Sequence, residues 1–274
     1  MPELELEHVQ LGFVGAGNMA QAMAFGFVKT GLLTADRVFA SAPSDRNLVK
    51  WRAKGMKTTN DNREVVRTCN MVFLACKPYQ LGDVLAEIKG EISEDKLLLS
   101  VIAGMDISFI ENNLGVKCKV VWVMPSTPCL VLAGVSSYCC NDAVSKSDKQ
   151  LVELFLCKVG MCFEIQERLM NAGAICCGAV PAFLFTAADA LADGSVKVGL
   201  QRDLALKIAA HNLIGAGKMM LETGLHPAQL KDNICSPNGA TICGIHALEK
   251  GGFRDCLISA IEDGVQRAER MSKD

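Results

Sequence analysis

Apolar residues follow two different patterns in the two halves of the chain. In the first half, short unbroken apolar runs alternate with segments of helical spacing. The runs that predict strands cover residues 9–14, 38–41, 71–76, 97–103 and 120–124, with 135–140 and 161–165 as further candidates. Helical spacing covers residues 19–29, 79–88, 107–112 and a stretch near 145–158. Unbroken apolar strands between amphipathic helices are typical of a parallel sheet covered on both faces.

After residue 167 only helical patterns remain. They cover residues 182–198, 202–223, a short piece around 227–230, 241–250 and 252–272. In the last of these, Phe253, Leu257, Ile261 and Val265 repeat every four residues, as one face of an amphipathic helix does. The sequence therefore predicts an α/β fold in two parts, a doubly wound sheet over residues 1–166 and an all-helical domain over 167–274.

Composition and charge narrow the class of protein. The chain has 274 residues, half of them hydrophobic, so it has enough apolar material for a sizeable core. The formal net charge is −2, and acidic and basic residues are mixed along the chain. We find no basic block or RNA-binding signature in the sequence and expect no nucleic-acid partner.

The 13 cysteines show no framework of disulfides or metal ligands. None are spaced as Cys-x-x-Cys, and the 4 histidines have no metal-site spacing with them. We therefore expect reduced thiols and no bound metal. The N-terminal MPELELEHVQ is acidic and has neither signal-peptide nor mitochondrial-presequence character, which favours a cytoplasmic protein.

One uncharged stretch, residues 169–188, is long enough to cross a bilayer. It contains Asn171, Gly173, Gly178 and Pro181 and is rich in alanine. Such a helix is more typical of the covered core of a soluble oligomer, so we expect no membrane partner.

The sequence GAGNMA at 15–20 joins the first predicted strand to the first helix. Gly15 permits a tight turn, Gly17 lets a pyrophosphate approach the backbone, and Ala20 allows close packing of helix and strand. The helix N-terminus offers unpaired N–H groups to phosphate. This pattern and its position predict a dinucleotide site.

The end of the second strand favours NADP(H), with NAD(H) as the alternative. An acidic residue there would bind the ribose hydroxyls of NAD. The chain instead has Ala42, Ser44 and Arg46 at this end. Hydroxyl and guanidinium groups suit a 2′-phosphate, although Arg46 could equally begin the next helix and face water.

Two further segments follow strand ends. ACKPYQ at 75–80 and the small residues of SVIAG at 100–104 lie where a doubly wound sheet faces its cofactor. In the second half, ICSPNGATICGIHALE at 234–249 has a polar loop that enters a helix. That loop is either a pocket for a small carboxylate or an ordinary N-cap.

In several motifs that occur in order, the chain resembles the pyrroline-5-carboxylate reductase family along its whole length. The resemblance is carried by GFVGAGNMA, ACKP, MPSTP at 124–128, ALADGSVKVGL at 190–200 and HPAQLKDNICSPNGAT leading into GIHALEKGGF at 226–253. It implies an N-terminal Rossmann-like domain and a C-terminal helical dimerisation domain, in a homodimer that often assembles further into decamers. The implied activity is NAD(P)H-dependent reduction of 1-pyrroline-5-carboxylate to L-proline.

The resemblance also assigns site residues. The substrate carboxylate is expected at Ala240 and Thr241, with Glu167 lining the site and Thr241 as the candidate to assist at the ring nitrogen. The cofactor is expected at Val14, Gly15, Ala16, Gly17, Asn18, Met19, Ala42, Ser44, Asn62, Ala75, Cys76, Lys77, Ala103 and Asn233.

The chain departs from the family pattern at a few positions. Where the family usually has Ser-Gly-Ser-Gly-Pro-Ala, this chain has Cys-Gly-Ala-Val-Pro-Ala at 177–182. Trp122 replaces a common arginine, Ser126 a usual asparagine, and Asn238 a glycine. Val180 is the most serious change if the glycine it replaces had a special backbone conformation.

Two alternatives stay open at the level of sequence. One is a diverged, catalytically weak member with a cofactor-binding or assembly role. The other is a relative of the β-hydroxyacid dehydrogenases, which normally use a lysine on the long helix after the sheet. Lys197 lies near the end of that helix, which disfavours this reading.

Overall fold

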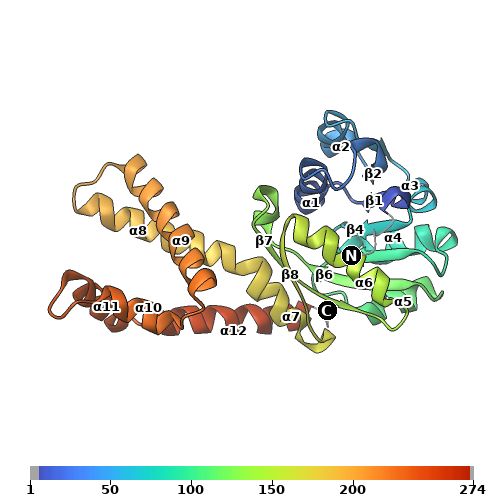
Figure 1. Ribbon diagram of the computed structural model, residues 1–274. Coiled ribbons are helices and arrows are strands. Elements are labelled where there is room, and N and C mark those ends of the chain that lie inside the picture. The colour runs from blue at the N-terminus through green and yellow to red at the C-terminus, as the bar shows by residue number, and fades with distance from the viewer. Residues whose placement is uncertain (1–5, 272–274) are drawn as a thin grey trace. The chain divides into compact units, whose positions relative to one another are not determined.

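The computed structural model describes residues 6–271, which divide by their contacts into two compact units (Figure 1). Within the described residues, the first unit comprises 6–179 with 264–271, and the second comprises 180–263. This division lies after the boundary expected near residue 166. The reason is that Met170 and Ala174 pack into the hydrophobic core of the sheet unit.

The first unit is built on an eight-stranded sheet of order β3-β2-β1-β4-β5-β6-β7-β8. The strands are β1 (Leu11–Val14), β2 (Val38–Ser41), β3 (Lys57–Thr59), β4 (Met71–Leu74), β5 (Leu97–Ser100), β6 (Lys119–Met124), β7 (Gly134–Cys140) and β8 (Gly160–Glu164). All neighbouring pairs are parallel except β6 and β7, which are antiparallel. A parallel crossover needs a dozen or more residues, and the short link between β6 and β7 does not provide them.

The helices of this unit alternate with the strands. They are α1 (Asn18–Lys29), α2 (Asp45–Arg52), α3 (Asn62–Thr68), α4 (Leu81–Ile88), α5 (Ile107–Leu114), α6 (Lys146–Lys158) and α7 (Met170–Gly173). The hydrophobic pattern did not predict α2, β3 or α3. The strand β3 has only three residues, Lys-Thr-Thr, and therefore shows no apolar run.

Side chains of the central strands alternate between two cores, one on each face of the sheet. Along β4, Met71 and Phe73 join the core that also receives α1 and α6. Val72 and Leu74 join the core formed with α3, α4 and α5. The doubly wound sheet predicted from the sequence is therefore confirmed.

The second unit is entirely helical within the described residues. Its elements are α8 (Val180–Lys197), α9 (Arg202–Thr223), α10 (Pro227–Ile234), α11 (Ala240–Lys250) and most of α12 (Phe253–Met271). Helices α8 and α9 lie side by side (Figure 1). Its buried apolar side chains are three alanines and Leu230, whereas large ones such as Phe185 and Leu221 are exposed. A helical unit with so little core of its own needs a partner to cover its apolar surface.

The helical stretch Glu167–Lys197 is long and apolar enough to cross a membrane by length and composition. Its most apolar window is not buried in the single chain. The stretch includes the uncharged segment that the sequence pointed to.

Candidate active site

A cavity of about 710 Å³ lies at the carboxyl ends of the central strands, where the strand order reverses between β1 and β4. This is where doubly wound sheets bind their ligands. Most of the cofactor residues expected from the sequence line it. They are Val14, Gly15, Ala16, Gly17, Asn18, Met19, Ala42, Asn62, Ala75, Cys76, Lys77 and Ala103.

The two glycines of the first turn do different things. Gly15 has a φ of +105°, and a Cβ placed on it would lie 2.5 Å from the carbonyl oxygen of Ala75. The turns after β1 and β4 are thus in close contact, and the Ala75 N–H donates to the Val14 carbonyl at 2.8 Å. At Gly17 a Cβ would meet nothing within 4 Å. Glycine at 17 therefore leaves open space beside the helix start instead of relieving a clash within the protein.

The first turn of α1 presents unpaired donors to the cavity. Gly17 is the N-cap residue, and no side chain caps this helix. The N–H groups of the first turn have no acceptor within the helix. The side chain of buried Gln21 donates to the Ala16 carbonyl at 2.8 Å and holds the turn in place. This arrangement fits the phosphates of a dinucleotide.

At the end of β2, only part of the expected set lines the cavity. Ala42 lines it together with Pro43 and Asn47, whereas Ser44 is the exposed N-cap residue of α2 and is not among the lining residues. Arg46 is exposed in the first turn of α2. The expectation that Ser44 contacts the cofactor stays a prediction.

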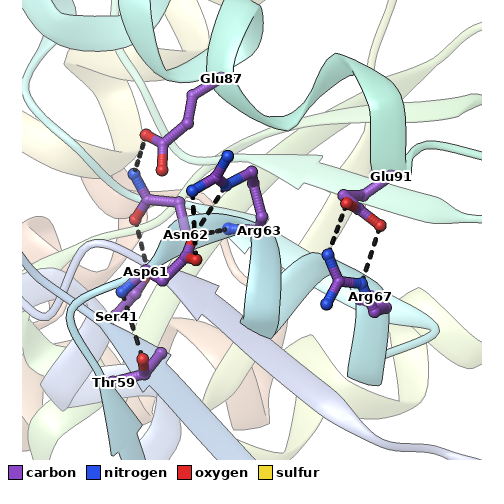
Figure 2. A network of polar contacts seen from close by, with 8 residues as sticks. All are labelled: Ser41, Thr59, Asp61, Asn62, Arg63, Arg67, Glu87 and Glu91. Carbon is purple, nitrogen blue, oxygen red and sulfur yellow. Dashed lines mark hydrogen bonds and ion pairs between the residues drawn. The ribbon is translucent and has the colours of Figure 1, made fainter.

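Asn62 is held by hydrogen bonds on both sides of its amide (Figure 2). Its Oδ1 accepts from the Ser41 hydroxyl at 2.7 Å, and its Nδ2 donates to Glu87 at 2.8 Å. The preceding Asp61 caps α3 by accepting from the Arg63 N–H at 2.9 Å. These contacts link β2, α3 and α4 beside the cavity and hold the Asn62 amide in a fixed orientation. The expectation that Asn62 contacts the cofactor stays a prediction.

Cys76 lies in the loop after β4. Burial raises the pKa of its thiol to about 11, so the thiol is neutral near pH 7. A neutral thiol in a cofactor cavity acts as a small packing group and a weak hydrogen-bond donor, not as a nucleophile.

A second cavity of about 380 Å³ shares Ala103 with the first. It is lined by Ala103, Gly104, Met124, Asn171, Ala174, Ile175, Gly178, Ala179, Gly264, Arg267 and Ala268. All of these residues belong to the first unit. No local motif in the sequence indicates this cavity, because its wall combines strand ends with a helix far along the chain.

Glu167 accepts a hydrogen bond from the Ile107 N–H at 3.0 Å, next to Asp106, which caps α5. The carboxylate thus stabilises the start of a helix in the first unit. Its expected place beside the substrate stays a prediction.

The remaining expected residues belong to the second unit. Gly239 is the N-cap of α11, so the N–H groups of Ala240 and Thr241 lie in its uncapped first turn. A Cβ on Gly239 would lie 3.1 Å from the Ser236 carbonyl oxygen, so this loop leaves little space for a side chain at 239. Asn233, on α10, accepts from Gln229 at 2.9 Å. Geometry suited to a carboxylate is present at Ala240 and Thr241.

The structure explains several departures from the family pattern. Val180 opens α8 without a positive φ, so its backbone needs no glycine. The π-helical turn Ala174–Ala179 precedes Pro181, and a wide turn accommodates a proline that cannot donate to it. Trp122 is buried and donates to the Ile102 carbonyl at 3.0 Å. Asn238 has a φ of 55°, which asparagine tolerates.

Several cavity residues were missed by sequence reasoning. Asn60 lines the first cavity and donates to the Ala42 carbonyl at 2.8 Å, and Asp83 and Glu87 on α4 also line it. Asn60 follows β3, and the sequence did not predict this strand because its residues are polar. The residues on α4 could have been found from their position after ACKP, on the polar face of a helix that begins at the cavity.

Comparisons with known proteins agree with this architecture. Residues 167–271 match the family described as pyrroline-5-carboxylate reductase dimerisation. Residues 10–104 match the family described as NADP oxidoreductase, coenzyme F420-dependent. Among curated relatives, pyrroline-5-carboxylate reductase 3 of Rattus norvegicus is 40% identical over 96% of both chains. Pyrroline-5-carboxylate reductase 2 of Homo sapiens is 40% identical over 96% of this chain and 84% of its own.

Solved structures give the same result. The NADP-bound pyrroline carboxylate reductase of Plasmodium falciparum superposes with a TM-score of 0.90 at 34% identity, covering 97% of this chain and 99% of that one. The pyrroline-5-carboxylate reductase of Coxiella burnetii does so with a TM-score of 0.89 at 32% identity, with the same coverage. These relatives, together with the cavity and the helical unit, show that this chain belongs to the pyrroline-5-carboxylate reductase family.

Proposed function

We propose that this protein reduces 1-pyrroline-5-carboxylate to L-proline with NAD(P)H. The observation that carries the proposal is the cradle formed by Gly15, Gly17 and the uncapped start of α1, at the point where the strand order reverses. The dinucleotide fits it because the donors are unpaired and no Cβ fills the space at Gly17. When bound, the dihydronicotinamide supplies the hydride that reduces the C=N bond.

The chain's own residues then bind and orient the reactants. The first turn of α1 holds the pyrophosphate, and Asn62 and Cys76 line the remaining walls. The N–H groups of Ala240 and Thr241 bind the substrate carboxylate, since an uncapped helix start stabilises an anion. A protonated cyclic imine is already electrophilic, so the protein contributes mainly proximity and orientation.

The Thr241 hydroxyl is the candidate hydrogen-bond partner of the ring nitrogen. Steady-state kinetics of Thr241→Ala, with loss of reduced-cofactor absorbance as the readout, tests this role. We expect a higher KM for the imine, a lower kcat, or both, with unchanged affinity for NADPH. Thr241→Ser is the matched control, because it keeps the hydroxyl. Wild-type kinetics in Thr241→Ala would contradict the role.

We further propose a preference for NADP(H) over NAD(H). Support comes from the end of β2, where Ala42, Pro43 and Ser44 follow the strand and the exposed Arg46 lies in the first turn of α2. The nearby Asp45 carboxylate forms an ion pair with Arg52. The ratio of kcat/KM for the two cofactors tests it. Arg46→Ala is expected to lower kcat/KM for NADPH and to leave that for NADH nearly unchanged.

The assembly that we propose is a homodimer through the helical unit, with a decamer as the larger form, in the cytoplasm and without a membrane partner. Support for the dimer comes from the exposed apolar side chains of α8 and α9 and from the family match over residues 167–271. Light scattering on the purified protein measures the assembly, and a fluorescent fusion shows its location. A monomer at micromolar concentration would contradict the dimer.

A second function, cofactor binding with weak catalysis, is favoured by one observation. Ala179 lines the second cavity at a position where family members usually have a serine, so that hydroxyl is missing here. The same absorbance assay separates the two functions. Tight binding of NADPH without oxidation of it in the presence of pyrroline-5-carboxylate would support the weaker member.

A further inference from the structure

Two cysteines of the first unit lie within reach of one another. Cys157, in the last turn of α6, and Cys162, in the middle of β8, have their sulfur atoms 3.6 Å apart. A disulfide has a sulfur–sulfur distance of about 2.05 Å, so side-chain rotation and a small shift would bring the two sulfur atoms together. Cys157 is exposed and Cys162 is partly buried. A small oxidant therefore reaches one thiol of the pair directly.

The backbone around this pair is held firmly. Only Val159 separates α6 from β8, which begins at Gly160. The Val159 carbonyl accepts from the Gly134 N–H at 2.9 Å, and a Cβ on Gly160 would lie 1.9 Å from the Gly134 carbonyl oxygen. The turn therefore packs tightly against β7 and is held there by a backbone hydrogen bond. The backbone at Cys157 and Cys162 is therefore held at a fixed spacing, and side-chain rotation is needed to bring the sulfur atoms closer.

A second contact fastens the other end of the same helix to the same strand. Lys149 on α6 and Glu164 on β8 form an ion pair. The helix and strand are therefore already aligned over their length before any covalent bond forms. Because the helix and strand are already ordered, forming a disulfide between the two cysteines costs little further conformational entropy. This favours a bond between them over a bond to an outside thiol.

From this geometry we propose that Cys157 and Cys162 form a reversible redox pair, which a small disulfide such as oxidised glutathione converts to an intramolecular disulfide. The other cysteines serve as the contrast. No other pair of sulfur atoms within residues 6–271 forms such a contact. In a reducing compartment such a bond is transient and responds to the thiol–disulfide balance.

The exchange balances in two steps. The Cys157 thiolate attacks one sulfur of oxidised glutathione, forms a mixed disulfide and releases one glutathione thiolate. The Cys162 sulfur then loses its proton to solvent and attacks the Cys157 sulfur, releasing the second glutathione. Cys157 is the first thiol to react because it is exposed, whereas Cys162 is partly buried. Burial and the neighbouring Cys157 raise the pKa of the Cys162 thiol. Overall the two protein thiols are oxidised and one glutathione disulfide is reduced to two thiols.

This redox pair is separate from the proposed reductase site. None of the residues that line the two cavities comes from α6 or β8. Failure of the redox proposal would therefore leave the proposed activity untouched, and the reverse also holds.

The test uses mass spectrometry on the native full-length protein. The protein is equilibrated in glutathione buffers of increasing oxidised fraction, alkylated, and digested with trypsin without reduction. Cleavage after Lys158 separates the two cysteines, so the disulfide appears as peptides 150–158 and 159–168 linked together. We expect this linked species to become the main form of both peptides and to disappear after dithiothreitol. Separate peptides at every buffer ratio, in protein that still binds NADPH, would overturn the proposal.

Two variants make the outcome independent of any effect on folding. Cys162→Ser should accumulate glutathione on Cys157, because the second thiol that releases it is missing. Cys157→Ser should leave Cys162 largely unmodified. Cys243→Ser, which removes an exposed cysteine of the second unit, is the matched control and should still give the linked peptides. Equal glutathione content on Cys157 in the wild type and Cys162→Ser would also overturn the proposal.

Discussion

The first glycine of the turn after β1 offers the sharpest test of the cofactor cavity. Gly15→Ala adds a single methyl group at a residue with a φ of +105°. The added Cβ would lie 2.5 Å from the Ala75 oxygen and 2.8 Å from the Cys76 nitrogen. Both neighbours are backbone atoms, so neither can rotate away. The change must therefore separate the turn after β1 from the turn after β4.

The expected magnitude has two parts. A positive φ costs a residue with a Cβ roughly 1–2 kcal/mol. The contact is about 0.9 Å shorter than an ordinary distance of 3.4 Å, and overpacking of this kind costs about 1–3 kcal/mol. The two costs together lower the free energy of unfolding by about 2–5 kcal/mol. This lowers Tm by on the order of 10 °C for a unit of this size.

Gly17→Ala is the matched control, because the same methyl group meets nothing in the protein. Gly17 has a φ of −72°, which alanine adopts freely, and its Cβ position is open. We expect Tm without cofactor to change by no more than about 2 °C. The Kd for NADPH should nevertheless rise by about tenfold or more, since the methyl group occupies the space at the helix start where the pyrophosphate approaches.

Differential scanning fluorimetry without cofactor and calorimetric titration with NADPH measure the two quantities separately. We expect a loss of stability in Gly15→Ala and a loss of affinity alone in Gly17→Ala. An unchanged Tm in Gly15→Ala would refute the steric reasoning. Wild-type NADPH affinity in Gly17→Ala would refute the position assigned to the cofactor.

Three other changes test the remaining parts of the structure. Asn62→Ala removes the hydrogen bonds to the Ser41 hydroxyl and Glu87. We expect the Kd for NADPH, measured by calorimetry, to rise about fivefold, and an unchanged Kd would contradict a contact between Asn62 and the cofactor. Glu167→Ala leaves a helix-start N–H unpaired and should lower the free energy of unfolding in urea by about 1 kcal/mol, whereas Glu167→Gln should recover most of it. Burial raises the pKa of Cys69 from 9.0 to about 12, so the unfolded thiol ionises first and stability falls as pH rises through this range. Cys69→Ala should flatten this fall in denaturant melts at pH 8–11, and an identical slope would exclude the buried thiol as its cause.

The order of strands and helices could be predicted from the sequence because it depends on local patterns of apolar and polar residues. Apolar runs such as 71–74 alternate between two cores, and only a sheet covered on both faces buries every residue of such a run. The polar β3 gave no such signal. It forms because its backbone pairs with β2, and that pairing depends on the rest of the sheet.

The cofactor turn was predictable for a similar reason. The Gly-x-Gly-x-x-Ala motif indicates backbone conformations and close approaches that few residues other than glycine allow. The partner of Asn62 was not predictable, since Glu87 is far away in the chain and approaches only when α3 and α4 pack on one face. The second cavity has the same origin, with walls from β6, the π-helical turn and α12.

The sequence by itself determined the class of fold, the dinucleotide turn and the family. It did so because each depends on residues that are neighbours in the chain or on motifs in a fixed order. The tertiary structure alone decided the antiparallel β6–β7 pair, the close contact of the turns at Gly15 and Ala75, and the approach of Cys157 to Cys162. These features depend on distances between segments, and such distances are set only when the whole core packs.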